Sequence, residues 1–454
     1  MGFATALSGL KAASTNLQVT GNNIANSQTT GFKESRAEFA DVYASSIGGV
    51  SKTQAGSGVK VTEVAQQFNQ GNIESTQNSL DLAVSGNGFF VLADKVNLPD
   101  SANPNAPVDP SLPTAYTRNG AFQLNSDGNV VNDKGQYLLA FAANGTTAAE
   151  GFSVGVFRPL TIDTAQGLPV ATENINMKLN VNGAAVVPPT TPFKPTDPLS
   201  YNNTTSITTY DVQGNAHIAS TYYVKTATAN EWEAYLFLDD FGITVGKPNP
   251  PGPYLKSEVA TPVNTPGAPI RMTFTETGLL EQVDGIAATK VDFVDIDLTK
   301  INPNISVTPM TFDLDYFGTT QFATPFSVNG LDQDGLPAGN LTGIDVDRTG
   351  VVFARYSNGG SKALGQVALA RFQSNQSLAK LGDTSWAQTS NSGTPIFGAA
   401  GDNNFGGIQS SALEGSNVDL SEQLVKLIIA QQAYQANSQT ITTEKTLIQT
   451  ILNA

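Results

Sequence analysis

The feature that most constrains this chain is an unbroken heptad pattern over residues 419–454. Steps of four and three residues connect Leu420, Leu424, Leu427, Gln431, Tyr434, Ser438, Ile441, Lys445, Ile448 and Leu452. The stripe lasts about four heptads and is apolar at both ends. Asp419 followed by Glu422 resembles a capping box, which predicts that a helix begins there. Such a helix would run roughly 50 Å, so it needs a long partner.

The N-terminal residues carry the same spacing and are almost uncharged. Lys11 is the only charged side chain before residue 31, and the C-terminal stretch from residue 421 holds only four charges. A helix that faces solvent normally carries charges on its outer face, so each terminal helix should touch protein on more than one side. The two helices could pair within one chain and close a single domain. Low charge instead favours packing between copies of the chain.

We therefore expect the apolar heptad residues of both ends to pack against other subunits of the same protein. The expected subunit-packing residues are Phe3, Leu7, Leu10, Leu17, Ile24, Leu420, Leu424, Leu427, Tyr434, Ile441, Ile448 and Leu452.

Composition excludes several classes of partner. The chain has 454 residues and a formal net charge of −15, which argues against nucleic acid or an anionic membrane as a partner. It has no cysteine, so neither disulfides nor thiolate metal sites can form. No apolar run is long enough to span a bilayer. Lys11 interrupts the first apolar stretch, and no positive segment precedes Phe3, so the N-terminus does not resemble a cleaved secretory signal.

The residues between the two helices read as β structure. From Leu80 the hydrophobic period changes to two, with turn signals at residues 119–120, 127–128 and 134–135. A similar β pattern returns at Leu341, after a block with proline clusters and strand-like runs that reads as an all-β sandwich or barrel. Residues 44–60 and 383–411 are rich in Gly, Ser or Asn and read as linkers.

The expected fold class is mainly β with coiled-coil-like helical termini, arranged as a nested multidomain rod. Residues 1–70 and 411–454 would form a terminal helical core domain with its linker. Residues 71–145 and 326–410 would form a discontinuous inner β domain. Residues 146–325 would be an inserted outer β domain, of one or two parts.

Two terminal motifs resemble those of the bacterial flagellar rod and hook proteins. One is Ala-Asn-Ser-Gln-Thr-Thr-Gly-Phe-Lys at residues 25–33, and the other runs from residue 416 through residue 437. Gly-Asn-Gly-Phe-Phe at 86–90 and residues 116–122 are similar to the β domain that these proteins share. The matching signature residues are Asn26, Thr29, Gly31, Phe32, Lys33, Asn417, Val418 and Asp419.

The resemblance implies a structural role. The large inserted block favours a hook subunit, which polymerises into the flexible tube that passes motor torque from rod to filament. Terminal helices would then line the channel, with the inner β domain in the wall and the insertion outermost. Implied partners are the chain itself, the flagellar rod, the hook cap, the hook–filament junction proteins and the type III export apparatus. The implied location is the extracellular hook and basal body of the flagellum.

The sequence carries no motif typical of an enzyme, and it predicts no cofactor and no metal. The single histidine, His217, lies in an expected strand and reads as an ordinary structural residue. Asp345 begins a sequence like a calcium loop, but Tyr356 stands where a glutamate is needed. Two alternatives remain open: a distal-rod-type flagellar protein, and a secreted β-sandwich binding protein whose aromatics would be Tyr222, Tyr223, Trp232 and Tyr235.

Overall fold

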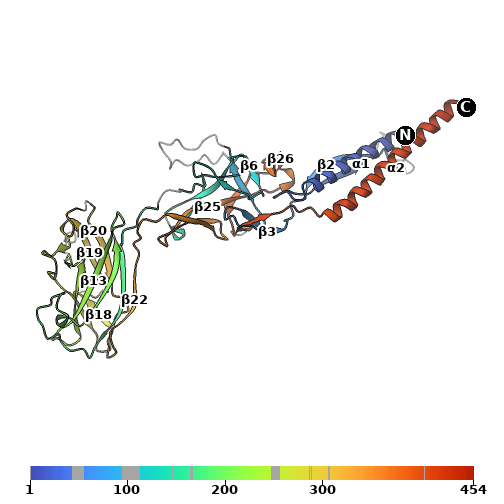
Figure 1. Ribbon diagram of the computed structural model, residues 1–454. Coiled ribbons are helices and arrows are strands. Elements are labelled where there is room, and N and C mark those ends of the chain that lie inside the picture. The colour runs from blue at the N-terminus through green and yellow to red at the C-terminus, as the bar shows by residue number, and fades with distance from the viewer. Residues whose placement is uncertain are drawn as a thin grey trace. The chain divides into compact units, whose positions relative to one another are not determined.

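The computed structural model describes residues 2–42, 56–94, 113–145, 147–163, 167–246, 256–285, 287, 289–304, 307–402 and 404–453. The chain divides into two compact units (Figure 1). Unit 1 comprises Met1–Thr164, Thr342–Arg355 and Ser361–Ala454, and unit 2 comprises Ala165–Leu341 and Tyr356–Gly360. Unit 2 is thus inserted into the sequence of unit 1. The expected three-part division, with the helices as a domain of their own, stays a prediction.

Two long helices form the ends of unit 1, α1 (Gly2–Ala25) and α2 (Leu420–Asn453). The backbone N–H groups of Ser421 and Glu422 donate to Asp419 Oδ1 at 2.8 and 3.2 Å. Asp419 therefore caps α2, and the predicted start of this helix is confirmed. The carboxylate of Glu422 pairs with Lys426 at 2.8 Å. The two helices run antiparallel beside a hairpin of β1 (Ser35–Asp41) and β2 (Val59–Gln66) (Figure 1).

Two small antiparallel pairs join the helical end of unit 1 to its main sheet. β3 (Ile73–Ser75) pairs with β30 (Ala412–Glu414), and β4 (Leu82–Ser85) pairs with β29 (Gly407–Ser410). Each pair brings a strand that follows α1 against a strand that precedes α2. The two ends of the chain are therefore held together at the base of the helices by main-chain hydrogen bonds.

The main sheet of unit 1 has 12 strands within the described residues, and its central path runs β23-β24-β25-β9-β5-β6-β27-β26. Its apolar core includes Phe89, Tyr116, Phe141, Phe372 and Trp386. The strands are β5 (Phe89–Ala93), β6 (Ala115–Thr117), β7 (Gln123–Leu124), β8 (Val130–Val131), β9 (Tyr137–Ala143), β10 (Phe152–Pro159), β23 (Leu341–Val346), β24 (Val351–Tyr356), β25 (Ser361–Arg371), β26 (Ala379–Gly382), β27 (Ser385–Ala387) and β28 (Ile396–Ala399).

Unit 2 consists of two sheets, of five and seven strands within the described residues, that share one apolar core. The smaller sheet contains β11 (Asn174–Asn182), β19 (Lys290–Ile296), β20 (Met310–Asp315), β21 (Thr320–Phe322) and β22 (Ser327–Gln333). The larger contains β12 (Asn203–Tyr210), β13 (Ala216–Lys225), β14 (Glu231–Leu238), β15 (Phe241–Thr244), β16 (Glu258–Val259), β17 (Ile270–Phe274) and β18 (Leu280–Val283).

The fold class predicted from sequence, mainly β with helical termini, is confirmed. The interpretation of residues 383–411 as a linker is wrong, because β27, β28 and β29 lie within this stretch and pair with β6, β25 and β4. The glycine and serine residues of this stretch allow tight turns and close packing of strands, so they do not mark a flexible linker. Of the other expected linker, 44–60, residues up to 55 lie outside the described residues, and β2 already begins at Val59.

Candidate assembly surfaces and the junction at the base of the helices

The contact between α1 and α2 is made by small and polar side chains. Asn23 Nδ2 donates to Gln423 Oε1 at 3.1 Å, and both residues are buried. A Cβ added at Gly9 would lie 2.5 Å from Asn437 Oδ1, so the helices approach closely there. Ala430, between these points, is 1% exposed. The contact line on α2 thus follows Gln423, Ala430 and Asn437, seven residues apart.

This contact line is rotated from the heptad stripe expected from the sequence. Leu427 and Ile441, together with Leu10, Leu17 and Ile24 of α1, are partly buried. Leu424 is 51% exposed and lies about 100° around α2 from the contact residue Gln423. The structure therefore pairs the helices within one chain, yet it leaves many of the expected packing residues uncovered: Phe3, Leu7, Leu420, Leu424, Tyr434, Ile448 and Leu452.

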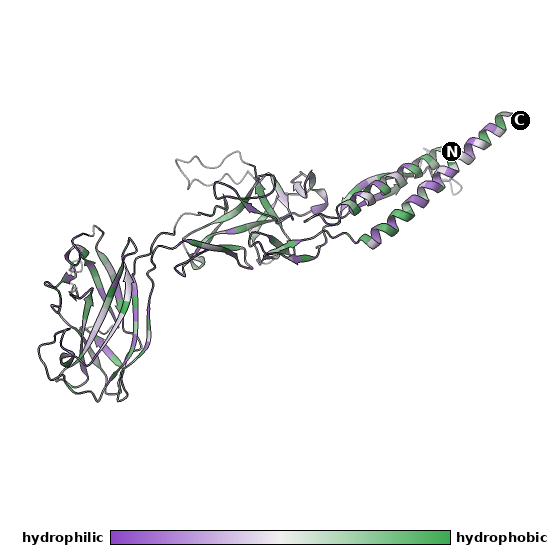
Figure 2. Cartoon of the chain, in the orientation of Figure 1, coloured by the Kyte–Doolittle hydropathy of each residue, from purple (hydrophilic) through white to green (hydrophobic). Residues whose placement is uncertain are grey.

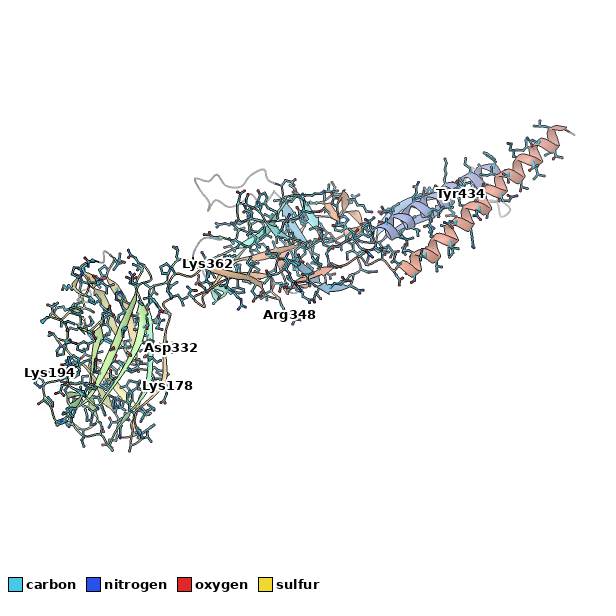
Figure 3. The ribbon with its side chains drawn as sticks, in the orientation of Figure 1. Lys178, Lys194, Asp332, Arg348, Lys362 and Tyr434 are labelled. Carbon is cyan, nitrogen blue, oxygen red and sulfur yellow. The ribbon has the colours of Figure 1, made fainter. Side chains whose placement is uncertain are left out.

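Exposed apolar side chains continue along α2 beyond the expected set. They form one group near its start and another near its end, and Figure 2 shows green hydrophobic segments along the helix to its C-terminal end. Their number exceeds the scattered apolar residues normal for a protein surface. The additional residues are Val425, Ile428, Ile429, Leu447 and Ile451. Tyr434, labelled in Figure 3, lies between the two groups along α2.

A buried ionic cluster holds the base of the helices. Lys33 Nζ lies 2.6 Å from Glu414 Oε1, and Arg118 Nη1 lies 3.1 Å from Glu414 Oε2. Lys33 also donates to Asn69 O at 2.8 Å, and the N–H of Gly71 donates to Glu414 Oε1 at 2.9 Å. The side chains of Lys33 and Glu414 are fully buried. Each charge is paired and hydrogen-bonded, as burial of a charge requires.

Burial shapes the electrostatics of this cluster. Desolvation lowers the pKa of Lys33, the charge and hydrogen bond of Glu414 oppose that effect, and nearby Arg118 adds to it. Desolvation likewise lowers the pKa of Arg118, against the attraction of Glu414. The two cations share one carboxylate, so Glu414 is the group on which the pairing of both depends.

A second set of polar contacts ties the start of α2 to the end of α1. Asn417 accepts a hydrogen bond from Glu34 N at 2.7 Å and donates to Gln67 O at 2.7 Å. Asn23 accepts from Ser35 N at 2.9 Å. Glu34 Oε1 accepts hydrogen bonds from Gln423 Nε2 at 2.8 Å and from Lys426 Nζ at 3.1 Å. The angle at which both helices leave the β structure is therefore specified by hydrogen bonds.

The signature residues gather in this junction. Gly31 has φ +70°, and a Cβ there would lie 2.5 Å from Asn119 N, so only glycine fits. Its N–H donates to Glu414 O at 2.7 Å. Asn26 Nδ2 donates to Asn22 O at 2.9 Å, which closes the end of α1, and Thr29 donates to Asn26 Oδ1 at 3.3 Å. Phe32 and Val418 are half-buried beside these turns.

Sequence reasoning missed Glu414 and undervalued Arg118. Glu414 lies 381 residues from Lys33 in the chain, and no local pattern relates the two. Arg118 stood in a noted β motif without an assigned role. A glutamate in an otherwise apolar or small-residue strand, next to the start of a helix, was the available signal.

Other candidate residues have structural roles. Trp232 and Tyr223 are 0% exposed in the core of unit 2, while Tyr222 and Tyr235 each pack a ring against Phe193. The Asp347 carboxylate accepts from the N–H groups of Thr349 and Val351, which makes this segment a turn. Among the described residues no cluster of acidic or histidine side chains could hold a metal ion. No helix in that part of the chain is long and apolar enough to cross a membrane.

A long terminal helix such as α2, whose apolar side chains remain exposed in the single chain, is typical of a structural protein that associates with its own copies. Comparisons with known proteins agree. The family models that match are the flagellar basal body rod protein (residues 3–33), the flagellar hook protein FlgE/F/G D1 domain (83–187), the flagellar basal body protein FlaE D2 domain (178–336) and the flagellar basal body rod FlgEFG protein C-terminal region (409–454).

Relatives that match over the full length identify the family more closely than the family models do. The flagellar hook protein FlgE of Salmonella typhimurium is 38% identical over 456 residues, and that of Escherichia coli K12 is 36% identical over 457, each covering 100% of both chains. The crystal structure of Helicobacter pylori flagellar hook protein FlgE2 covers 75% of this chain at 14% identity and a TM-score of 0.49, a likeness too weak to support an argument. On the full-length identities, the chain belongs to the flagellar hook protein family.

Proposed function

We propose that this chain is the structural subunit of the flagellar hook, which polymerises into the flexible tube between rod and filament. The observation that carries the proposal is the apolar surface of α2, where Leu424, Ile428 and Ile429 are 51–57% exposed in the single chain. Full burial of such a side chain from water is worth about 1.5–3 kcal/mol, so covering the exposed half contributes roughly half of that. Several of them together favour association with another surface over exposure to water.

Copies of the same chain are the partner that best suits this surface. The α2 helix carries few charges, and the chain as a whole has a net charge of −15, so close contact is easiest where side chains are neutral. The contact between α1 and α2 is already specified by Asn23, Gln423 and Asn437. Polar residues at such positions fix the register of a helix pair and leave the apolar faces for packing between subunits.

The buried cluster of Lys33, Arg118 and Glu414 supports the mechanical part of the proposal. A joint that transmits torque needs the helical core and the β wall of each subunit to move together. Glu414 connects the turn after α1, a loop of the main sheet and the strand before α2. Bending of the tube would then be taken up between subunits rather than inside this junction.

The finer partners follow from the same proposal. The ends of such a tube would contact the flagellar rod, the hook cap and the hook–filament junction proteins, and subunits would reach the extracellular growing end through the type III export apparatus, without a cleaved signal peptide. The distal-rod alternative has no residue-level observation in its favour. The binding-protein alternative loses its main support because Trp232 and Tyr223 are core residues.

Assembly of the purified chain tests the proposal. We expect sedimentable tubes, visible by electron microscopy, above a critical concentration. Replacement of Leu424 and Ile428 by serine should raise that concentration about threefold to tenfold for each side chain buried between copies. The matched control is Val263→Ser with Leu279→Ser, two unit 2 residues of similar exposure, 48% and 54%. A wild-type chain that stays monomeric at high concentration with both helices folded would refute the proposal.

A further inference from the structure

The C-terminal end of α2 carries an apolar surface that no described part of the chain covers. We call Leu447, Ile448, Ile451 and Leu452 the tip; these side chains are 52–79% exposed. Ile451 continues the sevenfold spacing of Gln423, Ala430 and Asn437, so it faces the same side of α2 that contacts α1 further along. The antiparallel register that joins Asn23 to Gln423 and Gly9 to Asn437 places Phe3 opposite Thr443. The tip therefore extends the contact line past α1.

A groove lies at the opposite end of the helix pair. Its volume is about 410 Å³, and we call it the base groove. One wall comes from the end of α1 and the following turn, with Asn26, Thr29 and Phe32. The other comes from the turn between β26 and β27, with Thr384, and from β27 itself, with Trp386. Its lining therefore combines the half-buried Phe32 and the almost fully buried Trp386 with polar and charged side chains.

The turn that forms the second wall is held in an unfavourable conformation. Gly382, Asp383 and Thr384 have φ values of +89°, +45° and +53° in succession. A β-branched residue such as threonine rarely adopts a positive φ, and such strain concentrates at binding sites. The Thr384 hydroxyl is buried and has no hydrogen-bond partner among the described residues. The backbone of the turn is held by a hydrogen bond from Thr117 Oγ1 to Thr384 O at 2.8 Å and by the ion pair of Asp383 with Lys134, while the Thr384 hydroxyl stays unsatisfied within the described part of the chain.

We propose that the tip of one subunit inserts into the base groove of the next subunit along the tube. This inference rests on the proposed function. An open helical polymer requires a contact between two different surfaces of the same chain, because a contact of one surface with itself closes into a dimer. Tip and groove lie at opposite ends of the helix pair, since Gln423 and Ile448 are separated by roughly 40 Å of helix. A shift along the helix axis by about that length brings one onto the other.

The chemistry of the two surfaces is compatible. The tip supplies aliphatic side chains, and the groove offers the half-buried ring of Phe32 and the side chains of Thr29 and Thr384. Trp386, which is 3% exposed, adds little accessible surface, and the rim includes the charged Lys380 and Asp383. Apolar anchors that enter a pocket with a polar rim are the usual source of binding energy at protein interfaces. The groove volume suits a few aliphatic side chains rather than a whole helix.

Disulfide trapping tests the contact, because the chain has no cysteine of its own. Tubes of the double variant Leu452→Cys with Thr29→Cys should form a ladder of covalent oligomers on oxidation, at least tenfold more than the control Leu452→Cys with Lys362→Cys. Lys362, labelled in Figure 3, is an exposed residue of β25 outside the groove. A disulfide needs Cα atoms within about 7 Å, so the ladder reports proximity.

Mixtures of single variants decide the direction of the contact. Tubes grown from Leu452→Cys chains and Thr29→Cys chains should yield mixed dimers only; dimers of Leu452→Cys alone would mean that tips meet tips and would overturn the proposal. Ile448→Cys with Asn26→Cys replaces the first pair if that variant fails to fold. Tubes that form normally but give no more cross-linking than the Lys362 control refute the tip contact and leave the proposed function standing. A wild-type chain that forms no tubes refutes the proposed function itself.

Discussion

At the scale of single residues, the protein depends on a few buried polar groups. Glu414 connects two cations from distant parts of unit 1, and its carboxylate is fully buried. In unit 2, His217 is buried with Nδ1 2.6 Å from Asp239 Oδ2 and Nε2 3.6 Å from Asp211 Oδ2. In both places a buried charged group is stabilised by charged partners. Removing one partner should therefore lower the free energy of unfolding more than removing a surface ion pair does.

Glu414→Gln should destabilise unit 1 by about 3 kcal/mol or more, because it leaves two buried cations without a counter-charge. Urea unfolding of the chain, followed by the signal of unit 1, measures the change. Glu422→Gln is the control: its carboxylate pairs with Lys426 on the surface of α2, and its loss should cost under about 0.5 kcal/mol. Equal effects of the two substitutions would mean that the buried cluster does not hold the junction.

The stability of unit 2 should fall as pH rises above neutrality. The hydrogen bond to Asp239 raises the pKa of His217, burial lowers it, and the charges of Asp239 and Asp211 raise it further, with a net rise. Because the folded pKa lies above the unfolded value of about 6.5, the stabilisation is complete below that pH and is lost as pH rises through the folded pKa.

The carboxylates of Asp211 and Asp239 do not titrate above neutral pH. Burial raises the pKa of each, but hydrogen bonds from Asn215 to Asp211 and from His217 to Asp239 outweigh it and leave both pKa values lowered. Unfolding free energies of unit 2 measured between about pH 6 and pH 9 should therefore decline in the wild type. They should vary less in His217→Gln, and a parallel decline in both proteins would remove His217 as the cause.

At the scale of elements, α2 is unevenly supported. Its first half contacts α1 through Gln423 and Ala430, both buried, while its last turns have exposed side chains. Isolated helices are marginal in water, so the supported and unsupported parts should differ in stability. In a single subunit, the local stability of α2 therefore depends on its contact with α1 rather than on helix propensity.

Hydrogen exchange should reveal this difference in the monomer. We expect slow exchange for amides of residues 423–437 and fast exchange for residues 446–453, because only the first set lies against α1. In assembled tubes the second set should become protected. Uniform protection along α2 in the monomer would show that the tip does not need a neighbouring subunit to stay folded.

At the scale of the whole molecule, unit 2 is an insertion that enters and leaves at one place. The N–H of Gly167 donates to Gly339 O at 2.7 Å, so the two connecting strands lie side by side. The apolar core of unit 2 is its own. The insertion can therefore be removed without opening the core of unit 1.

Deletion of residues 168–338, with Gly167 joined to Gly339 through one or two added glycines, should leave a chain that still forms tubes. The apolar surface of α2 and the Glu414 cluster remain in the shortened chain. Sedimentation and electron microscopy would compare assembly, and the spread of tube curvature would report the contribution of the insertion to bending. Loss of all assembly by a folded deletion variant would place essential contacts in unit 2.

Sequence alone determined the elements whose signals are local. The heptad spacing and Asp419 marked α2, and alternation with turn residues marked the β structure on both sides of the insertion. Each of these depends on neighbours a few residues apart. The same reasoning took residues 383–411 for a linker, because short strands rich in glycine look like loops until their partners are known.

Only the tertiary structure decided which side of α2 meets α1 and which buried charges hold the base of the helices. Gly9 and Asn23 set the contact line at Gln423 and Asn437, which is offset from the heptad stripe of α2. Glu414 meets Lys33 across 381 residues of chain. The physical reason is the same in both cases: close approach and charge pairing depend on distances in space, which a periodic pattern along one segment does not contain.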